Sequence, residues 1–276
     1  MVMSVNTNVG AMIALQNLNA TNAQLATTQN RINTGKTVAS AKDNGAIWAI
    51  AQGQRAEIGA LNAVKQSLDR GVAAVDVALA AGETVSDLLL QMKEKALAAT
   101  DASLTTSARS ALNEDFKALR DQIASVTTNA EFNGINLLET GATGFQALAN
   151  AQGTSTLTVG AEVMALGSTT VSVATTQSID TLTKAAASLT AVSNSIDAVS
   201  GALARLGTKS KALSTHITFV GKLSDALESG VGNLVDADLA KESAKLQALQ
   251  TKQQLGVQAL GIANQTPQLV LSLFRS

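Results

Sequence analysis

Aliphatic side chains recur at every seventh position along the C-terminal half of the chain. The repeat runs through Val192, Val199, Leu206, Leu213, Val220, Leu227 and Leu234. Leu189, Ile196 and Leu203 accompany it, each three residues before a member of the repeat. A sustained heptad repeat is typical of a helix that buries one seam against another helix. The pattern predicts a single helix over residues 182–234, about 80 Å long.

A second heptad tract lies in the N-terminal half. Its first position holds Leu61, Leu68, Val75, Gly82, Leu89 and Ala96. Its second position, three residues later, holds Val64, Gly71, Ala78, Val85, Met92 and Ala99. A shorter amphipathic helix follows, predicted by the three-four spacing of Leu112, Phe116, Leu119, Ile123 and Val126. We expect the three helices to pack side by side as an elongated antiparallel rod.

The pattern changes to period two between residues 133 and 178. Asn133-Gly134 is a turn dipeptide, and residues 156–159 and 170–173 alternate between hydroxyl and aliphatic side chains. These features predict a small β-hairpin region between the helical halves. Because the helices return after it, both chain termini are expected at the same end.

The two ends of the chain carry no charge but keep a helical pattern. Residues 1–30 and 253–274 contain no Asp, Glu, Lys or Arg. Leu18, Leu25 and Ile32 are spaced by seven near the start, as are Leu255, Ile262 and Leu269 near the end. Ordering thirty residues costs about 30–60 kcal/mol of backbone entropy, more than one lone helix with small side chains recovers. We therefore expect these ends to order against partners, while residues 43–238 fold alone.

Composition excludes several classes of protein. The 276 residues have a net charge of -1, 15% charged and 2% aromatic residues, and no cysteine. Without a basic patch, nucleic acid is not an expected partner. The absence of cysteine excludes disulfides and thiolate catalysis. Neither a secretory signal nor a run of eighteen apolar residues is visible, so no membrane span is expected.

Candidate chemical motifs are weak. Gly35-Lys36-Thr37 resembles the end of a phosphate loop, but Asn30 stands where the first glycine is needed. Asp236, Asp238 and Glu242 lack calcium-loop spacing and suit a helix N-terminus better. A dyad of His216 with Ser214 is disfavoured because His216 lies on the long heptad helix. We expect no enzyme activity, cofactor or metal, and interpret Trp48 as a packing residue.

Five segments resemble bacterial flagellin. They are VNTN at 5–8, NRINTGK at 30–36, SAKDNGA at 40–46, FNGINLL at 132–138 and ANQTPQLVLSLFR at 263–275. The resemblance implies a filament subunit secreted through the flagellum's own channel, whose terminal helices form a coaxial inner tube inside a shell of heptad helices. It also implies sister flagellins, an export chaperone and the secretion apparatus, and filament cap and hook junction proteins as partners.

Two segments depart from the family pattern. Ile47 and Trp48 replace a usual glycine and leucine at the joint, and Ser276 extends the terminus. The sequence LLLQMKEKALAA at 88–99 lacks the Arg-rich character that an innate immune receptor reads in many flagellins. We therefore do not expect recognition by that receptor.

The fold prediction is mainly α: an antiparallel coiled-coil bundle, a small β-hairpin region and paired terminal helices. The expected segments are an inner-tube helix with the start of the joint at 1–42, shell helices at 43–132, hairpins at 133–178, a long shell helix at 179–238 and an inner-tube helix at 239–276. The expected self-assembly residues are Val5, Asn6, Asn8, Val9, Met12, Leu15, Leu18, Leu25, Ile32, Leu255, Leu260, Ile262, Leu269, Val270, Leu273 and Phe274. The expected rod core is Leu61, Leu68, Val75, Leu89, Phe116, Leu119, Val192, Val199, Leu206, Leu213, Val220 and Leu227.

Three alternatives remain at this point. A hook–filament junction or another axial flagellar protein shares the terminal pattern. A helical signalling hairpin requires a membrane anchor or Glu-rich helices, and an enzyme requires pocket chemistry.

Overall fold

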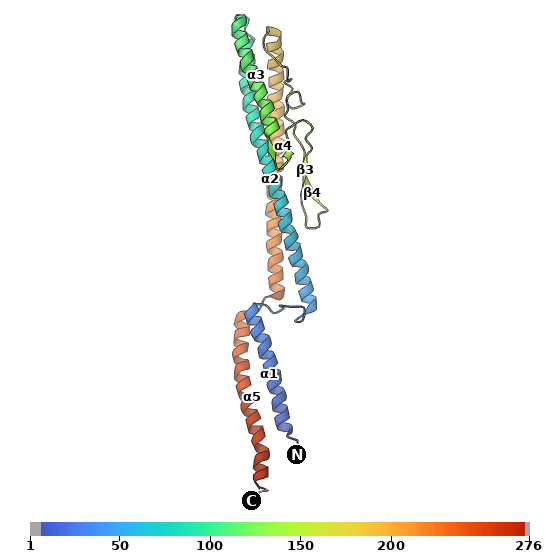
Figure 1. Cartoon of the computed structure of the whole chain (residues 1–276), viewed down its shortest axis with the longest axis vertical. Coiled ribbons are helices and arrows are strands. Elements are labelled where there is room, and N and C mark those ends of the chain that lie inside the picture. The colour runs from blue at the N-terminus through green and yellow to red at the C-terminus, as the bar shows by residue number, and fades with distance from the viewer. Residues whose placement is uncertain (1–6, 274–276) are drawn as a thin grey trace. The chain divides into compact units, whose positions relative to one another are not determined.

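The structure is a computed structural model that describes the backbone of residues 7–273 and the side chains of residues 7–265. Within that range it contains five helices and two separate two-stranded antiparallel sheets (Figure 1). The chain divides into two compact units. The long-helix unit comprises Glu57–Asp225, and the terminal unit comprises Met1–Ala56 and Ala226–Ser276.

Two long helices supply the core of the long-helix unit. They are α2 (Gly45–Ala99) and α4 (Leu182–Val235), close to the helices that the heptad tracts predict. Every member of the α2 tract between Leu61 and Ala99 is buried. An added Cβ on Gly82 would lie 2.7 Å from the Leu203 side chain of α4, so a small residue is required where these helices touch.

Helix α3 (Thr106–Asn129) packs beside α2 in the same unit (Figure 1). The Thr105 side chain caps its start by accepting a hydrogen bond from Ala108 N at 3.2 Å. Phe116 and Ile123 are fully buried on its apolar face. Lys95 of α2 pairs with Asp115 at 2.8 Å.

The predicted hairpin region is present. Strands β1 (Glu131–Phe132) and β2 (Ile135–Asn136) pair across a turn in which Asn133 has φ 52° and Gly134 has φ 80°. Both central residues have positive φ, which is the reason that Asn-Gly suits this turn. Strands β3 (Phe145–Leu148) and β4 (Thr156–Val159) form the second hairpin, with Phe145 opposite Val159.

The strand that the alternation at residues 170–173 predicts is absent, and this expectation was wrong. Only an isolated bridge joins Leu166 to Val171. Instead, Ser172 N donates to Ser195 Oγ at 3.0 Å, and Ser172 Oγ donates to Ala191 O at 3.0 Å. The segment therefore satisfies part of its hydrogen bonding on helix α4 rather than on a neighbouring strand.

Helices α1 (Val9–Thr34) and α5 (Leu239–Leu273) form an antiparallel pair in the terminal unit (Figure 1). Asn8 caps α1 by accepting from Ala11 N at 3.0 Å, and Gly35 ends it with φ 67°. The Asp238 carboxylate caps α5 by accepting from Ala240 N and Lys241 N. None of the described helices is long and apolar enough to cross a membrane.

Candidate functional site

The contact between α1 and α5 is a coiled-coil seam of small, hydroxyl and aliphatic side chains. Thr21, Thr28, Glu242 and Leu249 are buried, and the remaining members are partly buried. On α1 the seam follows Ala11, Ala14, Leu18, Thr21, Leu25, Thr28 and Ile32. On α5 it follows Glu242, Leu246, Leu249, Gln253, Gly256, Leu260 and Ala263. Both series keep three-four spacing, which is the geometry of interlocking helices.

Small side chains at the seam let the two backbones approach. A Cβ on Gly256 would lie 3.3 Å from Leu18 Cδ1, and one on Gly10 would lie 4.0 Å from Ala263 Cβ. Where a small residue such as Gly256 faces Leu18, the backbones can lie closer than two large side chains would permit. Ala, Gly and Thr therefore share the seam with leucine and isoleucine.

Polar contacts between described residues cross the seam near both ends and in the middle. Asn8 Nδ2 donates to Ala263 O at 2.7 Å near one end, and Gln253 Nε2 donates to Asn22 Oδ1 at 2.7 Å in the middle. At the other end Arg31 Nη1 pairs with Glu242 Oε1 at 3.1 Å. Glu242 is only 7% exposed, so its charge needs this partner. Away from this ion pair, the seam depends on uncharged groups.

Backbone hydrogen bonds join residues 35–37, which follow α1, to residues 235–237, which precede α5. Thr37 N donates to Val235 O at 2.7 Å, and Ala237 N donates to Gly35 O at 2.9 Å. Lys36 and Asp236 form an isolated antiparallel bridge between them. The Gly35-Lys36-Thr37 motif is thus part of a structural connection.

A second set of apolar side chains on the same two helices points away from the seam. On α1, Val9, Met12, Ile13 and Leu15 are 48–63% exposed. On α5, Leu255 is 59% and Val257 56% exposed. Isolated exposed aliphatics are ordinary, but several of them on helix segments without charged residues give a surface that favours association.

The predicted self-assembly residues therefore fall into two groups. Leu18, Leu25, Ile32 and Leu260 lie in the seam, where they are partly buried. Val9, Met12, Leu15, Leu255 and Ile262 are exposed. Val5, Asn6 and Phe274 lie outside the described residues. Leu269, Val270 and Leu273 belong to α5, but their side chains are outside the described range.

The predicted rod-core residues lie mostly inside the long-helix unit. Leu61, Leu68, Val75, Leu89, Phe116, Val192, Val199, Leu206, Leu213 and Val220 are buried. Leu119 and Leu227 are half-buried. On α4 the second buried position of the heptad is held by Ser188, Ser195 and Ala202, one residue before Leu189, Ile196 and Leu203.

Sequence reasoning missed Thr21, Thr28, Arg31 and Glu242 as seam residues. Hydroxyl and charged side chains do not register in a search for aliphatic spacing. The available signal was the three-four spacing of small residues from Ala11 to Thr28, read together with the first basic residue at Arg31.

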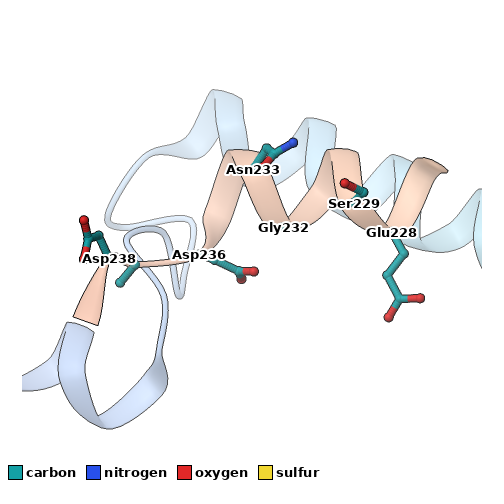
Figure 2. A pocket seen from close by; sticks show the side chains of 7 residues that line it. Glu228, Ser229, Gly232, Asn233, Asp236 and Asp238 are labelled. Atoms are coloured by element: carbon teal, nitrogen blue, oxygen red, sulfur yellow. The ribbon is translucent and has the colours of Figure 1, made fainter. Parts of the chain in front are cut away.

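The acidic residues near the end of α4 do not converge on a common point. Figure 2 shows Glu228, Asn233, Asp236 and Asp238 around a shallow depression within the terminal unit, with carboxylates that point in different directions. Asp238 is occupied in capping α5. No group of three or more His, Cys, Asp or Glu able to hold a metal ion occurs among the described residues.

The single histidine packs rather than pairing with a nucleophile. His216 Nε2 lies 2.8 Å from the carbonyl oxygen of Ala149, and its ring centroid lies 5.7 Å from that of Phe219. The contact with Ala149 fastens the loop after β3 to helix α4, and the contact with Phe219 lies within α4.

One carboxylate organises the loop between α1 and α2. Asp43 Oδ2 accepts from Ser40 N at 2.9 Å, from Ser40 Oγ at 3.1 Å and from Ala39 N at 3.1 Å. The hydrogen bond from the Ser40 backbone is the main cause that lowers the pKa of Asp43 below its ordinary value. The ionised carboxylate thus shapes the loop that leads into α2.

Comparison with known families matches both halves of the chain. The bacterial flagellin N-terminal helical region matches residues 5–143, and the bacterial flagellin C-terminal helical region matches residues 189–274. Between them, these matches include all of α1, α2, α3 and α5, and most of α4.

Curated relatives match over their full length. The chain is 57% identical to Flagellin FljK of Caulobacter vibrioides, covering 99% of this chain and 98% of that protein. It is 36% identical to a flagellin of Brucella melitensis, covering 99% of each. A solved structure described as a flagellar hook-associated protein of Vibrio parahaemolyticus shares the fold, with a TM-score of 0.59 and 15% identity over 70% of this chain and 100% of that one.

Full-length similarity to flagellins decides between the axial proteins, because the hook-associated structure is similar in fold alone. The five helices and two small hairpins agree with this assignment. The chain therefore belongs to the bacterial flagellin family, and its role is structural: it is a subunit of the extracellular flagellar filament that serves swimming motility.

Proposed function

We propose that the exposed faces of α1 and α5 are the surface through which this subunit packs against other copies in the filament. The observation that carries the proposal is that the apolar side chains of these two helices divide between the seam and an outward face on the segments that lack charge. The seam uses one set within the chain. The outward set, including Met12 and Leu255, is left for neighbouring subunits.

The absence of charge from these segments indicates that other copies of the same chain cover the exposed faces of α1 and α5. Described residues 7–30 and 253–265 hold no ionised side chain. In a helical polymer every copy presents the same residue to its neighbours, so one charge at the contact meets like charges at low dielectric throughout the polymer. An uncharged surface avoids this penalty.

The proposed arrangement assigns a layer to each segment. Residues 1–42 and 239–276 form an inner tube, 43–132 and 179–238 form the shell, and 133–178 lie outermost. The terminal helices gain their full order on polymerisation, because the outward apolar faces are covered only then. We propose no catalytic step for any of these segments.

Partners follow from the same proposal. Five flagellins of Caulobacter vibrioides are 46–58% identical to this chain, which favours a polymer of sister subunits as well as of identical copies. An export chaperone, the flagellar secretion apparatus, a filament cap and hook junction proteins complete the proposed set. The sequence at residues 88–99 disfavours recognition by the innate immune receptor.

Aspartate substitutions on the outward face test the proposal. Met12→Asp and Leu255→Asp place a charge where the single chain tolerates it, because both side chains are more than half exposed. We expect an unchanged melting temperature of the monomer and loss of sedimentable polymer.

Gln152→Asp is the matched control, since Gln152 is exposed in the turn between β3 and β4. It should polymerise like the parent chain. Polymerisation of the Met12 and Leu255 variants to the same extent as the control would remove the outward faces from the assembly mechanism.

A further inference from the structure

The chain contains two Asn-Gly pairs, and the structure holds them in very different ways. Asn44-Gly45 lies at the start of α2, and Asn133-Gly134 forms the turn between β1 and β2. Asn-Gly is the dipeptide in which the following backbone nitrogen most easily attacks the side-chain amide, because glycine has no Cβ to obstruct it.

Asn44 is restrained by its role as a helix cap. Its Oδ1 accepts a hydrogen bond from Ile47 N at 3.2 Å, and its backbone carbonyl accepts from Trp48 N at 2.9 Å. Attack on its side chain requires both bonds to break and the first turn of α2 to unravel. A cap of this kind shifts such an opening equilibrium by roughly tenfold.

Asn133 is exposed and belongs to a hairpin with only two paired positions, Glu131 with Asn136 and Phe132 with Ile135. A ladder this short opens locally at little cost. Solvent also reaches the turn freely, so water is available for hydrolysis.

A carboxylate is placed on the amide that must lose its proton. Gly134 N donates to Glu131 Oε1 at 3.1 Å. This distance lies within the range required of a general base that removes a proton from nitrogen. Glu131 is itself exposed, so no buried charge is created when it accepts the proton.

We propose that Asn133 is a site of spontaneous deamidation, with Glu131 as the proton acceptor, and that Asn44 is protected. Gly134 N forms a bond to Asn133 Cγ while its proton passes to Glu131. The bond from Cγ to the side-chain nitrogen then breaks, and ammonia leaves with that proton. Water opens the resulting cyclic imide at either carbonyl, giving aspartate or isoaspartate at position 133.

The product carries a new negative charge two residues from Glu131. Like charges at such spacing repel, and isoaspartate also lengthens the backbone of a two-residue turn. The hairpin should therefore loosen after the reaction. In an extracellular polymer this change accumulates with the age of each subunit.

The experiment follows both Asn residues in one molecule. The full-length chain is incubated at mildly alkaline pH and 37 °C, and peptides containing residues 44 and 133 are measured by mass spectrometry, with isoaspartate counted by enzymatic methyl labelling. We expect Asn133 to convert roughly tenfold faster than Asn44 in the folded chain, and the two rates to converge in denaturant. Equal rates in the folded chain, or an Asn133 that converts only in denaturant, would contradict the proposal that Asn133 is the reactive site.

Glu131→Gln tests the proton acceptor separately. The amide oxygen still accepts the hydrogen bond from Gly134 N, but it cannot take the proton. We expect slower conversion at Asn133, a rate that becomes as steeply pH-dependent as that of a base-catalysed peptide, and an unchanged rate at Asn44. An unchanged or faster rate at Asn133 would overturn the role of Glu131. Asn133→Asp supplies the product standard for the mass and for the loosened hairpin.

Discussion

Two glycines face each other at the start of the β3–β4 hairpin, and only one of them is irreplaceable. A Cβ on Gly144 would lie 2.0 Å from the backbone oxygen of Val159, whereas a Cβ on Gly160 meets nothing within 4 Å. Backbone atoms cannot rotate away as side chains do. The close approach of Gly144 therefore fixes the entry into β3.

Gly144→Ala should destabilise the long-helix unit by about 1–3 kcal/mol, because the strand must move to relieve the clash. Gly160→Ala is the matched variant and should change stability by no more than about 0.5 kcal/mol. Denaturant unfolding of both variants measures the difference. Equal stability of the two would mean that β3 and β4 are further apart than the structure has them.

Asp43 gives the loop before α2 a defined pH dependence. The pKa of Asp43 is lowered in the folded chain. Its contribution to the stability of the loop is therefore complete above the ordinary value of 3.8 and is lost as the pH falls through the lowered pKa. We expect the amides of Ala39 and Ser40 to lose protection below that window, measured against the intrinsic exchange rate of an unfolded chain at the same pH. Asp43→Asn should show fast exchange at neutral pH and no such transition. A Ser40 amide that is equally protected in both chains would contradict this assignment.

At the level of elements, periodicity predicted the helices well because their burial is one-sided and long. The α4 repeat predicted a helix over 182–234, and the helix spans Leu182–Val235. The second buried position of the α4 heptad was not predictable from aliphatic spacing, because Ser188 and Ser195 occupy it. A serine can be buried there because Ser188 Oγ donates to Ser178 O and Ser195 Oγ to Ala191 O.

Short strands were harder to predict than helices. The alternation of Thr156–Val159 marked β4, but its partner β3 has the undistinguished sequence Phe-Gln-Ala-Leu. The same alternation at residues 170–173 leads to side-chain burial without a strand, since its Ser172 groups bond to α4. Alternation reports which side chains are buried, and not what the backbone pairs with.

Charges on the buried heptad face of α4 should unfold the long-helix unit. Leu206 and Leu213 are each about 1% exposed, so Leu206→Asp or Leu213→Asp buries a charge without a partner. We expect a loss of about 3–5 kcal/mol and an earlier thermal transition of the monomer.

Thr208→Asp is the control for these variants, because Thr208 lies on the exposed face of α4 between the two leucines. It should melt close to the parent chain. If the Leu206 and Thr208 variants melt alike, the heptad face of α4 is not the buried one.

For the whole molecule, burial is distributed unevenly between the two units. Of the thirty-five buried apolar side chains in the described residues, five belong to the terminal unit: Val38, Ala51, Val231, Val235 and Leu249. Apolar burial is the main source of folding free energy. The long-helix unit is therefore the more stable of the two in a single chain.

Limited proteolysis of dilute monomer should cut the terminal helices first. We expect a resistant fragment that begins between residues 43 and 57 and ends between 225 and 238, since outside it few side chains are buried. Mass spectrometry of the fragment defines its ends. An α1 that stays intact as long as α2 does would show that the terminal pair is stable before assembly.

The absence of charged residues from 9–30 of α1 and from 253–265 of α5 also has a consequence for how the filament responds to its surroundings. Contacts between ionised groups weaken as dissolved salt screens them, and their reach shrinks to about 8 Å at physiological ionic strength. Contacts made by aliphatic and amide side chains escape this screening, and excluded salts such as sulfate strengthen them. In the arrangement that we propose, these segments hold the filament together along its axis, so we expect it to keep its cohesion as a swimming cell passes between dilute and saline water.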